Sequence, residues 1–287
     1  MRKKLAIIFV IVCIVFFYHQ DIYYLFHKEK TFELPLNTYV INLDRTPERY
    51  KAIDASLNKY KIPHQRFSAV DGYKLKITNI NTGEVFTGAE LKQDHTKINF
   101  ESKYTIACPS GDLTYIPKAI RLHATKYMTA GEFGVYCSHA GVWKEIIDNK
   151  LPYALIFEDD ASLHHDFAKN LELVLQNLPA DWDIIYLYLE GQKTFFRHNK
   201  YLAKLDDDGN GTASQAATLV SYKGAGKALE YIKTFRIPID NELSDGVNEK
   251  MILAYVTKPL LAEAPRISIF SANPSVSSIY DMGRVYK

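Results

Sequence analysis

The first part of the chain body carries the hydrophobic pattern of a strand, a helix and a second strand. A buried strand is predicted over residues 38–43, and apolar residues then recur at helical spacing up to Tyr60. Thr46 is placed as the helix cap and Pro47 as the first helical residue. A second strand is predicted over residues 65–70. This order of elements opens an α/β domain, for which we expect a central, mostly parallel sheet.

The same alternation of strands and helices returns beyond Gly131. A continuous apolar run over residues 153–157 is typical of a central parallel strand. Around this run the pattern predicts helices over residues 131–149, around 171–175 and over 224–235, and further strands over 183–187 and 218–221.

Residues 73–130 separate these two halves and show neither the helical spacing of apolar residues nor the two-residue alternation of a strand. They hold clusters of Asn, Thr and Gly, so we predict a long insertion with little regular structure. A loop of that length in a compact domain is usually functional or disordered. The expected organisation is an N-terminal segment over 1–27, a linker over 28–37 and one globular domain over 38–287 that contains the insertion.

The N-terminal segment has the pattern of a membrane anchor helix. Basic residues at positions 2–4 precede an apolar run over 5–18, which resumes over 22–26 after a polar interruption. About 20 apolar residues span a bilayer core, and no small-residue cleavage site follows the run, so we expect a retained anchor rather than a removed signal peptide. The positive-inside rule places the basic residues in the cytoplasm. We therefore expect a single-pass protein of an inner membrane or of a Golgi- or ER-like membrane, or a peripheral one whose helix lies in the cytoplasmic membrane surface.

Composition narrows the class of function. The net charge of +2 gives no global electrostatic signature of nucleic-acid binding, so we expect no nucleic acid as partner. Cys13, Cys108 and Cys137 form no C-x-x-C pair, which argues against a zinc ribbon or a thioredoxin-like motif. A Cys108–Cys137 disulfide and two buried free thiols remain equally open.

Three consecutive carboxylates, Glu158, Asp159 and Asp160, follow the central apolar run. In open α/β sheets, ligands bind beyond the carboxyl ends of the strands. Adjacent carboxylates repel one another and lose hydration when they are buried, and a hard divalent cation such as Mg²⁺ or Mn²⁺ compensates them, together with phosphate oxygens. Alternation along an extended segment turns Glu158 and Asp160 toward one side, so these two are the predicted metal ligands. Asp159 would face away unless the backbone bends.

A metal site of this kind suits the transfer of a sugar from a diphosphate. A metal stabilises the negative charge that develops on the departing diphosphate, and a nearby carboxylate takes the proton of the acceptor hydroxyl. The competing interpretation of the acidic cluster is a solvated turn that caps the following helix.

Several motifs resemble those of glycosyltransferase family 25, and they occur in order over residues 38–245. They are N-L-D-R-T-P-E-R at 42–49, A-V-D-G at 69–72, G-E-F-G-V-Y-C-S-H at 131–139, P-Y-A-L-I-F-E-D-D at 152–160, D-W-D at 181–183 and V-S-Y-K-G-A at 220–225. Each motif alone is weak evidence, but the ordered set is specific.

The resemblance implies a catalytic domain with the GT-A-like fold of nucleotide-diphospho-sugar transferases. It implies a nucleotide-sugar donor, typically UDP-galactose, and a β-linked product formed with inversion. The family includes lipooligosaccharide galactosyltransferases and is related to collagen galactosyltransferases, so the expected acceptor is a saccharide, a lipooligosaccharide or a glycoprotein. Residues 73–130 exceed the usual spacing between the second and third motifs, which bears on the acceptor more than on the chemistry.

The motif after the first strand supplies two candidate donor contacts. Asn42 is expected to contact the nucleotide, and Arg45 the diphosphate, because Arg suits bidentate phosphate binding. The alternative for Arg45 is a surface ion pair with a neighbouring acid. Arg49 fits better as a structural ion pair with an acid nearby.

Four further residues complete the candidate donor-binding group, namely Asp71, Ser138, His139 and Asp159. Asp71 is predicted to hydrogen-bond a ribose hydroxyl of the donor. The equally supported alternative is that Asp71 is only a turn residue before Gly72. His139 is placed at the phosphate or the donor sugar, and a satisfied buried histidine is at least as consistent with the pattern.

The predicted catalytic residues are Asp240 and Asp245, as general base or acceptor contact, with a polar loop as the alternative. The acidic run at 206–208 resembles a calcium loop only superficially, because the terminal Glu is missing at the expected spacing, so we interpret it as a solvated loop.

Two other classes of function compete with the transferase. One is a catalytically inactive, membrane-tethered sugar-binding module of the same fold. The weaker one is a glycoside hydrolase that uses two carboxylates, for which the sequence offers no second strong acidic motif.

Overall fold

The structure is a computed structural model that describes residues 37–118, 127–189, 195–205 and 214–264. These ranges belong to the compact unit Leu36–Lys287, which is distinct from Met1–Pro35. The predicted anchor over 1–27, the linker up to residue 36 and the acidic run at 206–208 lie outside the described residues. Within the described ranges, no helix combines the length and the apolar character needed to cross a membrane.

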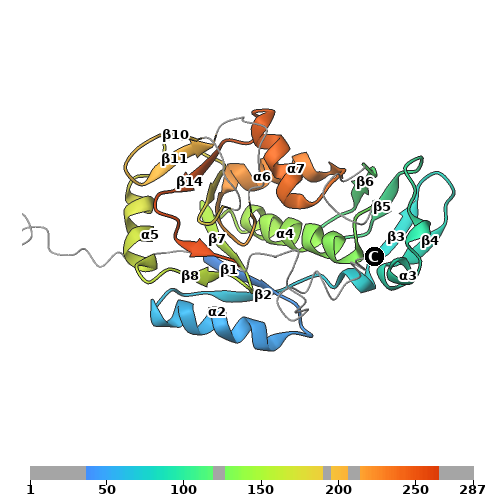
Figure 1. The fold of residues 1–287 in the computed structure, drawn as a ribbon, viewed down its shortest axis with the longest axis horizontal. Helices are drawn as coiled ribbons and strands as arrows, with labels where there is room; N and C mark the ends of the chain where they lie inside the picture. The colour runs from blue at the N-terminus through green and yellow to red at the C-terminus, as the bar shows by residue number, and fades with distance from the viewer. Residues whose placement is uncertain (1–36, 119–126, 190–194, 206–213, 265–287) are drawn as a thin grey trace, which may run out of the picture. The chain divides into compact units, whose positions relative to one another are not determined.

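An eight-stranded sheet is the largest element of the described unit (Figure 1). Its strands, in spatial order, are β10 (Phe195–Arg197), β11 (Leu202–Leu205), β14 (Ala254–Thr257), β9 (Ile184–Tyr186), β12 (Ala217–Ser221), β7 (Tyr153–Glu158), β1 (Asn37–Asn42) and β2 (Gln65–Ser68). All five strands predicted for this part of the fold are confirmed, with boundaries that differ by one or two residues. A separate pair joins β8 (Ser162–Leu163) to β15 (Ala262–Glu263).

The sheet is mixed, so the prediction of a mostly parallel sheet is wrong. β1 is parallel to β2 and to β7, and β14 is parallel to β9. β12, however, runs antiparallel to both of its neighbours, and β11 is antiparallel to β10 and β14. Every side chain of β12 is buried. A short apolar run of this kind indicates burial without indicating strand direction.

Helices cover both faces of the sheet next to β1. α2 (Pro47–Lys59) joins β1 to β2, and α4 (Ala130–Asp148) lies in the connection from β2 to β7. Because β2 and β7 flank β1 on opposite sides, right-handed crossovers place these two helices on opposite faces, as Figure 1 shows. The remaining helices of the described unit include α5 (Phe167–Gln176), α6 (Tyr222–Ile232) and α7 (Ile239–Asn248).

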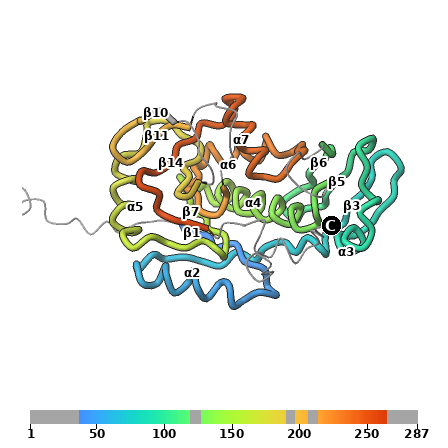
Figure 2. The backbone as a smooth tube through the Cα atoms, viewed as in Figure 1, coloured from blue at the N-terminus to red at the C-terminus, as the bar shows by residue number. Residues whose placement is uncertain are grey.

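Residues 73–130 contribute four strands to a second sheet, so the prediction of little regular structure is wrong. The strand order is β13 (Thr234–Phe235), β6 (Leu113–Tyr115), β5 (Tyr104–Ile106), β3 (Lys76–Asn79) and β4 (Val85–Thr87), accompanied by η1 (Gly72–Lys74), α3 (Gly88–Gln93) and η2 (His95–Lys97). Figure 2 shows β3, β5 and β6 gathered near α3 at one end of α4. These strands are too short for a two-residue period to stand out, although their inward side chains join the core around α4.

A disulfide joins the second sheet to α4. Cys108 follows β5 and Cys137 lies within α4, with 5.2 Å between their Cα atoms. Both side chains are buried. The structure therefore favours the disulfide over the two free thiols that the sequence left as an alternative.

Candidate functional site

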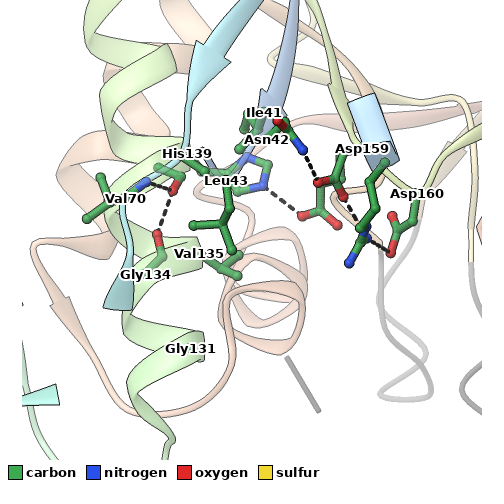
Figure 3. A pocket seen from close by; sticks show the side chains of 14 residues that line it. Ile41, Asn42, Leu43, Val70, Gly131, Gly134, Val135, His139, Asp159 and Asp160 are labelled. Atoms are coloured by element: carbon green, nitrogen blue, oxygen red, sulfur yellow. Dashed lines mark hydrogen bonds and ion pairs between the residues drawn. The ribbon is translucent and has the colours of Figure 1, made fainter. Parts of the chain in front are cut away.

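The carboxyl ends of two adjacent parallel strands open onto a pocket. β1 and β7 pair with Ile41 opposite Glu158, so the residues that follow each strand meet at one edge of the sheet. The pocket encloses about 530 Å³, part of it open to solvent. Its lining residues, shown in Figure 3, are Ile41, Asn42, Leu43, Arg49, Ala69, Val70, Gly131, Gly134, Val135, Ser138, His139, Glu158, Asp159 and Asp160. This edge is where open α/β sheets bind their ligands.

All three residues of the acidic cluster line this pocket. Glu158 is the last residue of β7, and the chain turns at Asp159 and Asp160. The turn ends the alternation of the strand. The exception that the sequence left open for a bent backbone therefore applies, and Asp159 lines the pocket with the other two carboxylates.

Arg49 and Asn42 hold the two aspartates. Arg49 Nη2 lies 2.6 Å from Asp159 Oδ1 and 3.0 Å from Asp160 Oδ2. Asn42 Nδ2 donates to Asp159 Oδ2 at 2.7 Å (Figure 3). The prediction that Arg49 pairs with an acid is confirmed, but its place inside the pocket was missed because its partners lie far along the chain. The signal that could have revealed it is its position as the last residue of the motif at 42–49.

The pocket carries more negative than positive charge. Three carboxylates accompany one guanidinium, and Asp160 Oδ1 is buried without a hydrogen-bond partner in the described part of the chain. Burial, followed by the charge of Glu158, raises the pKa of Asp160 to about 7 although Arg49 opposes the shift. Burial also raises the pKa of Asp159, against the lowering effects of Arg49 and Asn42. The single guanidinium thus leaves these carboxylates incompletely compensated.

The chemistry of these carboxylates fits a divalent cation. Glu158 and Asp160 offer hard oxygen donors, and the unpartnered Oδ1 of Asp160 is an oxygen that a cation would satisfy. Across the ranges that the structure describes, no three His, Cys, Asp or Glu side chains converge as a ready-made metal site. A cation here would take its remaining ligands from phosphate oxygens and water, as Mg²⁺ commonly does.

The Asn42 side chain is buried, and both ends of its amide are hydrogen-bonded within the protein. Besides Asp159, Nδ2 donates to the Thr46 carbonyl at 2.9 Å, and Oδ1 accepts from Arg66 Nε at 2.8 Å. Asn42 therefore joins the end of β1 to the start of α2 and to the acidic cluster. Its backbone carbonyl also accepts, from the Ala69 amide at 2.9 Å and from Arg66 Nη2 at 3.0 Å, so the predicted contact with a nucleotide rests on its place in the pocket wall.

Arg45 and Asp71 lie beside the pocket and not in its lining. Arg45 Nε is 3.9 Å from Asp71 Oδ2, and its guanidinium lies over the Tyr73 ring at 5.8 Å from the centroid. Asp71 also accepts from the Tyr73 amide at 3.1 Å. The structure thus brings these two predicted residues to each other, next to the lining residues Leu43 and Val70.

Ser138 and Gly134 bring α4 close to the segment that follows β2. The Ser138 hydroxyl donates to the Gly134 carbonyl at 2.7 Å and accepts from the Val70 amide at 2.9 Å. A Cβ on Gly134 would lie 2.6 Å from the Val70 carbonyl oxygen, which is too close for any side chain. Ser138, a predicted contact of the nucleotide-sugar donor, therefore lines the pocket, but its hydroxyl is used to bond α4 to the segment after β2.

His139 faces Glu158 from α4. Its Nε2 lies 2.9 Å from Glu158 Oε1 (Figure 3). The structure thereby links His139, a predicted contact of the sugar donor, to Glu158, a predicted metal ligand.

Asp240 and Asp245 both lie on α7. Asp240 accepts from the backbone N–H of Gln215 at 3.0 Å, whereas Asp245 lies 3.8 Å from Arg236. Five helical residues correspond to a rotation of about 140°, so the two carboxylates leave different faces of the helix. Neither lines the pocket.

Comparisons with known proteins agree with these motifs. The model of glycosyltransferase family 25 (LPS biosynthesis protein) matches residues 36–243. The chain is similar to procollagen galactosyltransferase 2 of Homo sapiens, with 27% identity over 152 residues, or 52% of this chain and 20% of that protein. It is similar to inactive glycosyltransferase 25 family member 3 of Homo sapiens, with 28% identity over 152 residues, or 52% of this chain and 21% of that protein. Procollagen galactosyltransferase 1-A of Xenopus laevis is 40% identical over 63 residues, or 21% of this chain and 10% of that protein. The matched segments thus span about a fifth or less of these relatives.

Proposed function

Because the chain belongs to glycosyltransferase family 25, we propose that it moves galactose from UDP-galactose onto an acceptor hydroxyl with inversion of configuration. The observation that carries the proposal is the undercompensated acidic cluster in the pocket where β1 and β7 end. Galactose is supported by the relatives that are named as procollagen galactosyltransferases. The acceptor that we propose is a saccharide or a glycoconjugate. A GT-A-like fold is part of the proposal, supported by the β1–α2–β2 opening unit and by the acids that follow β7.

In this proposal the donor diphosphate lies at the acidic cluster. Glu158 and Asp160 would hold Mn²⁺ or Mg²⁺, which supplies Lewis-acid compensation for the charge on the departing UDP. Arg49 adds a positive charge beside the same aspartates, and its fork of donors suits a phosphate group. Asn42 and Asp159 keep Arg49 and the start of α2 in place.

Asp240 is our candidate for the general base. Inversion requires the acceptor oxygen to bond to the anomeric carbon as the sugar–phosphate bond breaks, while the hydroxyl proton passes to a base. Asp240 accepts from the backbone N–H of Gln215. The carbonyl of the next residue, Ala216, accepts from the backbone N–H of Glu158 at 2.9 Å. These two bonds bring Asp240 near the strand end that carries the acidic cluster. We prefer it to Asp245, whose partner is Arg236.

The alternative function is a sugar-binding module without turnover. One observation keeps it as the alternative: the relative named as inactive is 28% identical to this chain, much like the 27% identity of a relative named as a transferase. Overall similarity therefore does not separate the two functions.

Release of UDP from a panel of UDP-sugars, measured on the full chain with Mn²⁺, separates them. We expect UDP-galactose to be hydrolysed faster than UDP-glucose or UDP-N-acetylglucosamine, with water acting as acceptor, and we expect EDTA to abolish the release. A binding module would instead show a donor-dependent rise in melting temperature and no release of UDP. A chain that shows neither response would contradict both functions.

We also propose that the domain works in an oxidising compartment, attached to the membrane through residues 5–26. The Cys108–Cys137 disulfide supports this location, because such bonds persist in the periplasm and the ER lumen and are rare in the cytosol. The basic residues at 2–4 support the same orientation, with the domain across the membrane from the cytoplasm.

A further inference from the structure

His139 projects from a helix whose position is tightly constrained. Its side chain is 1% exposed, and its ring centroid lies 5.8 Å from that of Trp143, one turn further along α4. The helix begins with a capping box formed by Thr129 and Glu132. Cys137, two residues before His139, is bonded to the second sheet. The imidazole therefore has little freedom to move toward a ligand.

The two ring nitrogens of His139 have different surroundings. Nε2 lies 2.9 Å from Glu158 Oε1, and a carboxylate oxygen there accepts the hydrogen bond that a ring N–H donates. Nδ1 is buried and has no hydrogen-bond partner among the described residues. With Nε2 facing Glu158 and Nδ1 buried, the ring presents no open nitrogen to a phosphate or a sugar.

We infer that His139 is a positioning residue, which orients Glu158 for the cation and does not itself contact the donor. The inference rests on the proposed function, because that function assigns Glu158 to the cation. Glu158 is 28% exposed at the pocket wall, with Oε1 bonded to His139. Oε2 forms no hydrogen bond with the part of the chain that the structure describes. A hydrogen bond from a second residue is a common way to orient a metal-binding side chain.

Orientation matters because a glutamate side chain has three rotatable bonds. Fixing them when a cation binds costs conformational entropy. The bond from His139 fixes Oε1 before binding, on a helix that is itself held by the capping box and the disulfide. Loss of this bond should therefore weaken cation binding even where the fold is kept.

The variants His139→Gln and His139→Asn separate orientation from packing. Glutamine carries an amide nitrogen near the position of Nε2 and can still donate to Glu158, whereas the shorter asparagine cannot reach it. Both variants lose the imidazole ring. We expect the UDP-bound full chain to bind Mn²⁺ about tenfold more weakly or worse in His139→Asn, and within about threefold of wild type in His139→Gln. Electron paramagnetic resonance of free Mn²⁺ measures this affinity without turnover.

Wild-type affinity in His139→Asn, or an equal loss in both variants, would overturn the inference. Failure of the wild-type chain to bind Mn²⁺ with UDP would instead contradict the proposed function. The two failures are thus distinguishable.

Nitrogen-15 chemical shifts of the imidazole give a second readout that needs neither metal nor donor. The signals of His139 are identified by their loss in His139→Gln. We expect a proton on Nε2 in the metal-free chain. A proton on Nδ1 alone would overturn the inference, because Nε2 could not then donate to Glu158.

Discussion

Replacing Asp160 with asparagine should lower the rate of sugar transfer by about 10²-fold or more while the protein stays folded. Asp160 lies in the pocket, with Oδ2 3.0 Å from Arg49 and with Oδ1 buried and unpartnered among the described residues. Asparagine keeps the size of the side chain but removes the negative charge and one acceptor oxygen. A cation at this position would lose a ligand, and the charge on the departing UDP would lose its compensation.

The fold should tolerate the Asp160→Asn change. Burial and the charge of Glu158 raise the pKa of Asp160 to about 7, so its ionised form is disfavoured in the folded protein relative to the unfolded chain. At pH 8 without metal, the folded state therefore carries an unfavourable charge that asparagine removes. We expect an unchanged or raised melting temperature at that pH.

Asp148→Asn is the matched control for this prediction. Asp148 ends α4, is 53% exposed and pairs with Lys144 at 2.9 Å, away from the pocket lining. The same chemical change should leave the transfer rate near wild type there. Full activity in Asp160→Asn, measured as UDP release beside this control, would rule out the proposed role of the acidic cluster.

Loss of the Cys108–Cys137 disulfide should lower the free energy of unfolding by about 3–4 kcal/mol, as the loop-closure model gives for a separation of 29 residues. In a domain of this size that corresponds to a melting temperature lower by about 10 °C. The bond crosses from the loop after β5 to α4, and α4 carries Gly134, Ser138 and His139 into the pocket. Reduction should therefore weaken donor binding as well as stability.

A variant with Ser at both positions 108 and 137 controls for other effects of the reductant. Its melting temperature should equal that of the reduced wild-type chain and should not respond to reductant. Alkylation of the unreduced, denatured wild-type chain should leave Cys108 and Cys137 unmodified. Finding both positions alkylated would contradict the disulfide and the oxidising compartment that it supports.

The sequence predicted best where one long run of residues determines one element. The apolar run before Glu158 indicated β7, and helical spacing with Pro47 at the first position indicated α2. Because β1 and β7 both end at the pocket, their motifs also indicated where the site would be. Local pattern was thus sufficient for the elements that carry the acidic cluster.

The local sequence pattern could not predict features that depend on residues far apart in the sequence. The direction of β12 is set by pairing with β7 and β9, and a buried five-residue run has no direction of its own. Strands β3 to β6 are held by one another and by α4, so each was too short to be recognised alone. The place of Arg49 depends on Asp159 and Asp160, which only the fold brings near it.

The coupling between nucleotide and cation tests the central claim most directly. Isothermal titration of UDP into the full wild-type chain should give a dissociation constant at least about tenfold lower with saturating Mn²⁺ than with EDTA, because each ligand supplies charge that the other needs. The same comparison in Asp160→Asn should show little difference. Equal UDP affinity with and without Mn²⁺ in the wild-type chain would contradict the claim that a divalent cation and a diphosphate together complete the carboxylates after β7.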